Sequence, residues 1–424
     1  MPAPFGPSKP TISPFCIFKL ISLTIALLFI DLDILLIIIS FYSVYFIVHK
    51  FLGGKIPFWD FHIIYCASKN FFLGNFPYGL EMHRECLHPN ITLTANFMPS
   101  TYEMLKYLGS INILTANFFW VFLEIISFSL IFFVLKETFK YNYEWRNFFL
   151  IIFSFGSIFF FSFFSGNISV ILYGFLAIGI YFLKKKLFNY YYLIVLFVSL
   201  FKFYYLTFLL LPFYILGWKS LRNILISIIL FFTIQYFFYI KNPDLTIAFF
   251  DVIQGKYEDI LPTRFLTGTG LYSIIEKMPW VLFGGNNISA NSFTGSFFSL
   301  GINLLFWFIG SSIILLSVFL CLKGKRIKNS KNHFLFCISF GILVINLIIP
   351  RLVVYDLILT VPIFFYLLSR INFKKFQINE FRAKFFFIFL FLVFFDHHFP
   401  FLVIITFLTL FIYSEFYKKN IFIY

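Results

Sequence analysis

Residues 111–135, INILTANFFWVFLEIISFSLIFFVL, form an almost unbroken apolar run that decides the class of fold. A helix crosses the hydrocarbon core of a bilayer, about 30 Å thick, with roughly 20 apolar residues. This run is long enough to cross it, so we expect a membrane-spanning helix here.

Similar apolar runs recur along the whole chain of 424 residues. Apolar residues make up 61% of the sequence and charged residues 12%, whereas soluble domains carry about 25% charged residues. We therefore expect an all-α polytopic membrane protein, one multi-pass domain over residues 1–424 with about 12 transmembrane helices. The predicted spans are 20–48, 111–135, 147–164, 167–183, 188–200, 203–217, 223–240, 296–322, 333–349, 352–369, 384–395 and 399–417.

The excess of basic residues fits membrane topology rather than nucleic-acid binding. The chain has 33 Lys and Arg against 18 Asp and Glu, a formal charge of +15. Most of these basic residues lie in alternate, mainly short loops, and short positive loops stay in the cytoplasm. Both termini are therefore expected in the cytoplasm, and no nucleic-acid partner is expected. The first apolar run is too long for a cleavable signal peptide and has no small-residue cleavage site.

Two long loops, residues 49–110 and 241–295, then lie together on the outer face of the membrane. Half of the acidic residues are in them, and long loops often carry function. These acids are Asp60, Glu81, Glu85, Glu103, Asp244, Asp251, Glu258, Asp259 and Glu276. Cys66 and Cys86 share the first loop and can pair in an oxidising compartment, but the sequence leaves this pairing open.

The first loop contains a predicted short helix, which the segment Trp59-Asp60-Phe61-His62-Ile63-Ile64-Tyr65 opens and which runs to Phe72, before Gly74. Asp60 is expected at its N-cap, and Gly74 in the usual stop position. Its apolar stripe would let the helix lie in the membrane interface. A capping carboxylate is rigidly placed, so Asp60 can be a structural cap, a general base at the membrane surface, or both.

An ordered series of motifs resembles the GT-C class of integral-membrane glycosyltransferases, and most closely glycosyltransferase family 87. Each motif is short, and together they cover roughly residues 55–370 on the expected outer side. They are Asp60-Phe61 with Tyr65, Gly74-Asn75-Phe76-Pro77-Tyr78, Asn96-Phe97-Met98-Pro99, Gly166-Asn167-Ile168-Ser169, Phe201-Lys202-Phe203-Tyr204, Gly285-Asn286-Asn287-Ile288-Ser289 and Pro350-Arg351 with Tyr355. Two motifs depart from the family pattern: Met98 interrupts an aromatic residue followed by two prolines, and Asn167 replaces Gln.

The resemblance implies a GT-C-like fold whose outer loops carry short interfacial helices, and a polyprenyl-phosphate-linked sugar donor. A hexose, first of all mannose, would pass to a glycolipid or glycan acceptor at the outer face of a bacterial inner membrane. Because a phosphate monoester has a second pKa near ~6, it leaves as a dianion without a general acid. The reaction then needs Asp60 as base and cations for the phosphate. It requires no cofactor, and a divalent metal is compatible with it but not indicated by the residues.

Three basic residues are candidates for the donor phosphate: Lys202, Arg264 and Arg351. A charge inside an apolar stretch is costly and usually functional, which favours Lys202. Lys202 and Arg351 can instead extend to the lipid headgroups, and Arg264 can be an ordinary solvated loop residue.

Further candidates would bind the sugar or the acceptor. They are His62, Tyr65, Tyr78, Asn167, Asn286 and Tyr355. Turn or capping roles are at least as well supported for the two asparagines.

Other acidic or metal-like groups are discounted, and three further functional classes remain open. Asp31-Leu32-Asp33 lacks a nucleotide-binding domain around it, and the spacings of His83, Cys86 and His88, and of Asp396-His397-His398, fit polar loops better than zinc sites. The open alternatives are a lipid or glycan transporter or flippase, an envelope-polysaccharide polymerase or ligase, and a structural assembly subunit.

Overall fold

The computed structural model describes residues 58–78, 86, 97–139, 158–159, 162–253, 271–272, 275, 297–328, 330, 332–349, 354–372, 399–417 and 421–422. Within these residues every regular element is a helix, apart from one isolated antiparallel bridge between Ile371 and Phe422. The all-α prediction is therefore confirmed for this part of the chain.

The described elements are α-helices (α) joined in places by short 3-10 helices (η). In chain order they are α3 (Trp59–Phe72), α5 (Pro99–Leu105), η1 (Lys106–Ser110), α6 (Ile113–Phe139), α8 (Ile168–Lys184), α9 (Phe188–Ser199), η2 (Phe203–Leu209), α10 (Leu210–Leu216), η3 (Gly217–Ser220), α11 (Leu221–Lys241), α12 (Pro243–Ile253), α16 (Phe297–Lys323), α17 (Lys325–Lys328), α18 (His333–Ile348), η4 (Val354–Leu357), α19 (Thr360–Ser369) and α21 (Phe399–Phe416).

Three described stretches are long and apolar enough to cross a bilayer: Ile113–Phe139, Phe203–Lys241 and Ile302–Lys323. Large apolar side chains on them face outward, such as Phe118 at 80% exposed and Phe308 at 64%. Apolar surface of this extent is unfavourable in water but expected against lipid. These helices indicate a membrane protein, as the sequence predicts.

Shorter apolar helices accompany the three long stretches. They are α8, α9, α18, α19 and the Val403–Phe416 part of α21. The predicted spans 20–48 and 384–395, and most of 147–164, lie outside the described residues. The count of about twelve spans therefore stays a prediction.

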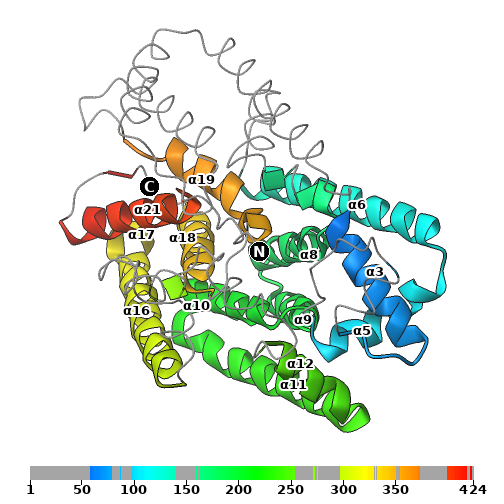
Figure 1. Cartoon of the computed structure of the whole chain (residues 1–424). Helices are drawn as coiled ribbons and strands as arrows, with labels where there is room; N and C mark the ends of the chain where they lie inside the picture. The colour runs from blue at the N-terminus through cyan, green and yellow to red at the C-terminus, as the bar shows by residue number, and fades with distance from the viewer. Residues whose placement is uncertain are drawn as a thin grey trace, which may run out of the picture.

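Helix α18 is the central helix of the bundle. Its residues from Phe336 to Ile348 are all buried, whereas the peripheral α11 buries only Ile224, Ser227 and Phe231. Helix α18 packs against α10, α16, α19 and α21, and α8 packs between α6 and α9. Figure 1 shows α3 and α5 on one side of the molecule and α16 and α21 on the other.

The N-cap of α3 lies two residues earlier than predicted, so Asp60 is not the N-cap. The N-cap is Phe58, whose φ of 60° lies in the left-handed region, and Asp60 lies in the first turn. A first-turn carboxylate is still stabilised by the positive end of the helix dipole. Gly74 follows the helix with a φ of 83°, the conformation expected of a helix stop.

Most of α3 is buried in the protein. Phe61 and Ile64 of the predicted apolar stripe are 0% and 1% exposed. Helix α3 packs on η1 so closely that a Cβ added at Gly109 would lie 2.4 Å from the Lys69 backbone. The first-loop helix is therefore a packed element of the fold rather than a separate surface helix.

The start of α3 lies directly on the turn before α8. The Phe58 N–H donates to the Phe164 carbonyl at 2.8 Å. A Cβ added at Gly166 would lie 2.7 Å from Phe61 Cβ, and the φ of Gly166 is 67°. Trp120 Nε1 of α6 donates to the Gly166 carbonyl at 3.0 Å, so α6 also contacts the place where α3 meets the turn before α8.

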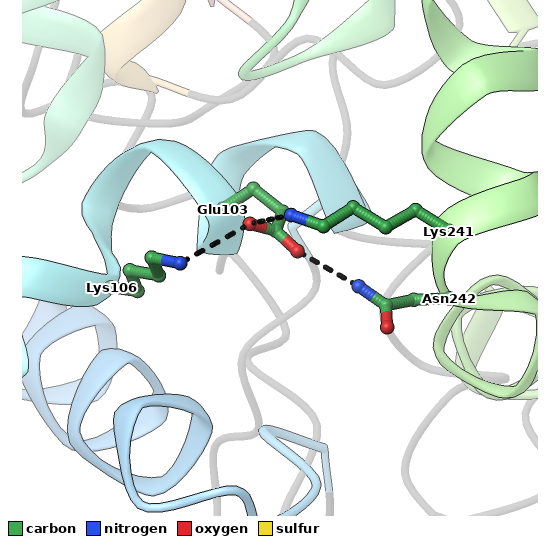
Figure 2. Close-up of polar contacts among 4 residues, drawn as sticks. All are labelled: Glu103, Lys106, Lys241 and Asn242. Carbon is green, nitrogen blue, oxygen red and sulfur yellow. Dashed lines mark hydrogen bonds and ion pairs between the residues drawn. The ribbon is translucent and has the colours of Figure 1, made fainter.

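A second polar contact joins the first loop to the end of α11. Figure 2 shows Glu103 of α5 between Lys241, Asn242 and Lys106. Lys241 Nζ and Asn242 Nδ2 donate to Glu103 at 2.9 and 2.8 Å, and Lys106 Nζ lies 3.8 Å from the same carboxylate. This carboxylate is mostly buried, so three donors stabilise it where a solvated ion pair would contribute little.

The first loop also contains the disulfide that the sequence left open. Cys66, on the buried face of α3, is bonded to Cys86. The bond ties residue 86 to α3, which is itself packed on α6 and η1.

The junction around Gly166 generates a stability prediction. We expect Gly166→Ala to destabilise the protein by about 2–4 kcal/mol, because it combines a left-handed φ with overpacking against Phe61. Gly74→Ala is the matched control: its φ is also positive, but a Cβ there meets nothing within 4 Å. Thermal unfolding of both variants in lipid nanodiscs measures the difference, and equal melting temperatures would contradict the packing argument.

Candidate active site

Asp60 is held by the residue that begins α8. Asn167 Nδ2 donates to Asp60 Oδ2 at 2.9 Å. The side-chain oxygen of Asn167, Oδ1, accepts from the Ser169 backbone N–H at 2.9 Å and so caps α8. Because the cap fixes which end of the amide faces the helix, the amide nitrogen must face Asp60. One side chain therefore caps a helix and orients the carboxylate.

Two helix N-termini meet at this carboxylate. Asp60 lies in the first turn of α3, and Asn167 is the N-cap of α8. The positive ends of both helix dipoles therefore favour a negative charge at this point. Asp60 thus lies where both helix ends favour negative charge, and the Asn167 amide fixes the direction of its side chain.

Lys202 is connected to the same helix start through Ser169. Lys202 Nζ donates to Ser169 Oγ at 2.7 Å and lies 5.8 Å from the centre of the Tyr204 ring. Its backbone is extended, with φ −142° and ψ 111°, in the break between α9 and η2. Asp60, Asn167, Ser169 and Lys202 therefore form one hydrogen-bonded series drawn from three segments of the chain.

Helix α5 stabilises the break from which Lys202 emerges. A helix end leaves backbone carbonyls without intrahelical donors. Ser100 Oγ donates to the Leu200 carbonyl at 2.5 Å, and Thr101 Oγ1 donates to the Phe201 carbonyl at 3.1 Å. Both hydroxyls are buried in the first loop, so this loop fixes the backbone on which Lys202 sits.

A second carboxylate, Asp356 of η4, lies on the other side of Ser169. Asp356 Oδ1 accepts from the Tyr204 hydroxyl at 2.8 Å and from Ser169 Oγ at 3.4 Å. Its backbone carbonyl accepts from the Tyr173 hydroxyl at 2.7 Å, and the residue is 1% exposed. We call Asp60, Asn167, Ser169, Tyr173, Lys202, Tyr204 and Asp356 the polar cluster. It places two carboxylates and one ammonium group at the ends of α3, α8 and η2.

The structure brings together three of the predicted site residues, Asp60, Asn167 and Lys202. The hydroxyls of Tyr65 and Tyr78 donate to the backbone carbonyls of Ile111 and Phe97 at 2.9 and 2.8 Å. Burial raises the pKa of both tyrosines, so both remain neutral donors.

His62 and Tyr355 are close in sequence to two members of the polar cluster, Asp60 and Asp356. His62 is two residues after Asp60, and burial lowers its pKa, which favours the neutral imidazole. Tyr355 is half-buried in η4, next to Asp356. Arg264, Asn286 and Arg351 lie outside the described residues.

Within the described ranges, no three His, Cys, Asp or Glu side chains gather as a metal site would require. His83, His88 and residues 396–398 are outside these ranges, as are Asp31 and Asp33.

Two buried acids, Asp356 and Glu124, were not among the predicted site residues. Both lie inside predicted spans, at 1% and 0% exposed. An ionisable residue within an apolar span is a functional candidate by default, and that signal was present for both. Ser169 and Tyr204 were within the quoted motifs but carried no signal of their own, because hydroxyl residues are common in such helices.

The double role of Asn167 generates the next prediction. Asn167→Ser keeps a good capping residue, whereas Asn167→Asp keeps the cap but sets a second carboxylate against Asp60. We expect Asn167→Asp to be less stable than Asn167→Ser by about 1.5–3 kcal/mol at neutral pH. The difference should shrink as the pH falls towards the ordinary range of aspartate, near ~4, where protonation removes the repulsion. Melting temperatures across this pH range measure it, and a pH-independent difference would show that the two carboxylates do not interact.

No protein-family model, curated protein or solved structure matches the chain.

Proposed function

We propose that the protein is an integral-membrane hexosyltransferase of the GT-C type, most like glycosyltransferase family 87. It transfers a hexose, with mannose as first candidate, from a polyprenyl-phosphate donor to a lipid or envelope-glycan acceptor. The observation that carries the proposal is the hydrogen-bonded series from Asp60 to Lys202. It provides a fixed base and a cation in one site, as the reaction requires.

In this reaction the acceptor oxygen attacks the anomeric carbon of the sugar, and its proton passes to Asp60. The bond between the anomeric carbon and the phosphate oxygen breaks, and the electron pair leaves with the polyprenyl phosphate. In-line attack inverts the anomeric configuration. Lys202 stabilises the charge that develops on the leaving phosphate, and we assign Arg264 and Arg351 the same role.

The proposal includes a topology. About twelve spans would place both termini in the cytoplasm and the loops 49–110 and 241–295 on the outer face of a bacterial inner membrane. The Cys66–Cys86 disulfide supports this side for the first loop, because disulfides persist in oxidising compartments. A donor with a polyprenyl chain also fits a protein whose helices carry apolar surface outward.

A second candidate function is an ion- or proton-coupled transporter of lipids or glycans. The observation that favours it is Asp356, a buried carboxylate in an apolar part of the chain that shares Ser169 with Lys202. Such intramembrane charge pairs occur in proton relays. Asp60 argues for the transferase, since a coupling site does not require a base at the start of an outer-loop helix.

The transferase proposal predicts that Asp60→Asn abolishes sugar transfer. The amide keeps the size of the side chain but cannot accept the proton, so we expect the rate to fall by about 10²–10⁴-fold. The assay uses purified protein in lipid with labelled polyprenyl-phosphate mannose or glucose and a mixed envelope-lipid acceptor fraction. Asp244→Asn is the control, because Asp244 is an exposed carboxylate in the first turn of α12.

The substitution Lys202→Gln tests the transferase proposal at the donor phosphate. For the transferase it should lower kcat by about 10–100-fold, because the charged hydrogen bond to the leaving phosphate becomes strongest in the transition state. Full transfer by Asp60→Asn would remove Asp60 as the base. Absence of transfer by the wild type, together with proton uptake that requires Asp356, would favour the transporter.

The proposed topology predicts that Cys86 is reached from outside the cell membrane. After reduction with an impermeant phosphine, an impermeant maleimide should label the wild type in intact spheroplasts, because Cys86 is half-buried. Labelling should be lost in Cys86→Ser. Labelling of Cys86 only after the membrane is permeabilised would reverse the topology.

A further inference from the structure

Asp356 is a buried carboxylate that the proposed reaction does not use. It lies in η4, between α18 and α19, and is 1% exposed. A charge in such an apolar part of the chain is costly and is usually accompanied by an opposite charge. The ammonium group of Lys202 shares the Ser169 hydroxyl with it. A role for Asp356 is therefore to be sought in its effect on Lys202.

Helix α8 holds Asp356 at two points. Ser169 and Tyr173 are four residues apart on α8, so they lie on one face of the helix, and both are 0% exposed. Ser169 Oγ lies 3.4 Å from Asp356 Oδ1, and the Tyr173 hydroxyl donates to the Asp356 backbone carbonyl at 2.7 Å. Because one contact is to the side chain and the other to the backbone, the carboxylate has a fixed place against α8.

The chemistry of the groups sets the direction of the hydrogen bonds. An ammonium group can only donate, so Ser169 Oγ must accept from Lys202 Nζ, at 2.7 Å. The single hydroxyl proton of Ser169 is then left for Asp356, whose carboxylate can only accept. The series therefore runs from Lys202 through Ser169 to Asp356. The carboxylate polarises the hydroxyl and so makes it a better acceptor for the ammonium group.

Tyr204 provides a second connection between the same two residues. Its hydroxyl donates to Asp356 Oδ1 at 2.8 Å, and its ring centre lies 5.8 Å from Lys202 Nζ. An aromatic ring attracts a cation that lies within about 6 Å of its centre. Asp356 is therefore hydrogen-bonded to two groups that contact the ammonium group, the Ser169 hydroxyl and the Tyr204 side chain.

The ammonium group of a lysine needs support of this kind. It is the end of a flexible four-carbon stem with three donors. Lys202 is half-buried, and the hydroxyls of α5 fix only the backbone of the break from which it emerges. The position of the ammonium group therefore depends on the groups around Nζ.

We infer that Asp356 is a positioning residue: through Ser169 and Tyr204, its carboxylate holds the ammonium group of Lys202 in one place. Asp356 then acts on the reaction only through Lys202, which meets the leaving phosphate. The catalytic meaning of this arrangement rests on the proposed transferase function, but the pairing of the two charges does not.

Thermal unfolding in lipid nanodiscs tests the pairing without any sugar substrate. Asp356→Leu and Lys202→Gln should each lower the melting temperature by about 5 °C or more, because each removes the opposite charge that stabilises the other residue. The combined variant should lose clearly less than the sum of the two single losses. The control combines Asp356→Leu with Lys241→Gln, whose losses should add, because Lys241 pairs with Glu103. Additive losses for Asp356 and Lys202 as well would overturn the inference.

The transfer assay tests the consequence for the reaction. We expect Asp356→Leu to lower kcat by about 10–100-fold, as Lys202→Gln does, and Asp356→Asn to recover part of this loss, because the amide oxygen still accepts from Ser169 and Tyr204. In a Lys202→Gln background Asp356→Leu should lower kcat no further, since Asp356 acts only through Lys202. A second fall of 10-fold or more in that background would indicate a structural role only. Equal kcat in the wild type and a folded Asp356→Leu variant would also remove the positioning role.

A second variant serves both experiments if Asp356→Leu does not fold. Ser169→Ala keeps both charges and removes the hydroxyl between them, so its losses of melting temperature and of kcat should likewise be non-additive with those of Lys202→Gln. Additive losses would overturn the inference. Absence of transfer by the wild type would reject the proposed function and leave the unfolding result to decide the pairing.

Discussion

The close approach of α3 to the turn before α8 is the contact on which the candidate site depends. Asp60 and Asn167 are separated by 107 positions in the sequence, and they meet because Gly166 has no side chain to keep Phe61 away. Two further hydrogen bonds stabilise this approach: one from the Phe58 N–H to the Phe164 carbonyl, and one from the Trp120 indole to the Gly166 carbonyl. A base at the end of a flexible loop would lose orientation with every movement of the loop. Here packed helices set its direction, which is how precise sites are usually supported.

The polar cluster also shows how charge is accommodated in an apolar protein. Asp356 and Lys202 have opposite charges and share the Ser169 hydroxyl, and tyrosine hydroxyls donate to Asp356. Buried polar groups are tolerated when their hydrogen bonds are made, and a network of this kind is rigid for the same reason. The rigidity limits how far the ammonium group of Lys202 can move, which suits the role that we propose for it at the donor phosphate.

The sequence predicted the class of fold and the central part of the site for different reasons. Long apolar runs are a direct consequence of the bilayer thickness, so the helical membrane class followed from hydropathy. Asp60, Asn167 and Lys202 were selected from the motifs of the family resemblance, and Lys202 also because a charge inside an apolar stretch is costly; the structure joins them by hydrogen bonds. The predicted N-cap of α3 was wrong. Aspartate commonly caps helices, but here Phe58, whose backbone is left-handed, occupies the N-cap position and Asp60 lies in the first turn. The structural roles of Tyr65 and Tyr78 depend on carbonyls of Ile111 and Phe97, and a sequence pattern does not reveal such tertiary contacts.

The contact between Glu103 and Lys241 joins residues 138 positions apart, and it bears on the order in which the protein is assembled. Seven described helical elements lie between α5 and α11, so the Glu103 carboxylate has no partner at the end of α11 until that helix has been synthesised and inserted. The hydroxyls of Ser100 and Thr101 likewise have no partners until the carbonyls of Leu200 and Phe201, which follow α9, have been synthesised. The first loop therefore reaches its final structure late, after more than half of the chain is in the membrane. Until then it depends on the local packing of α3 and η1.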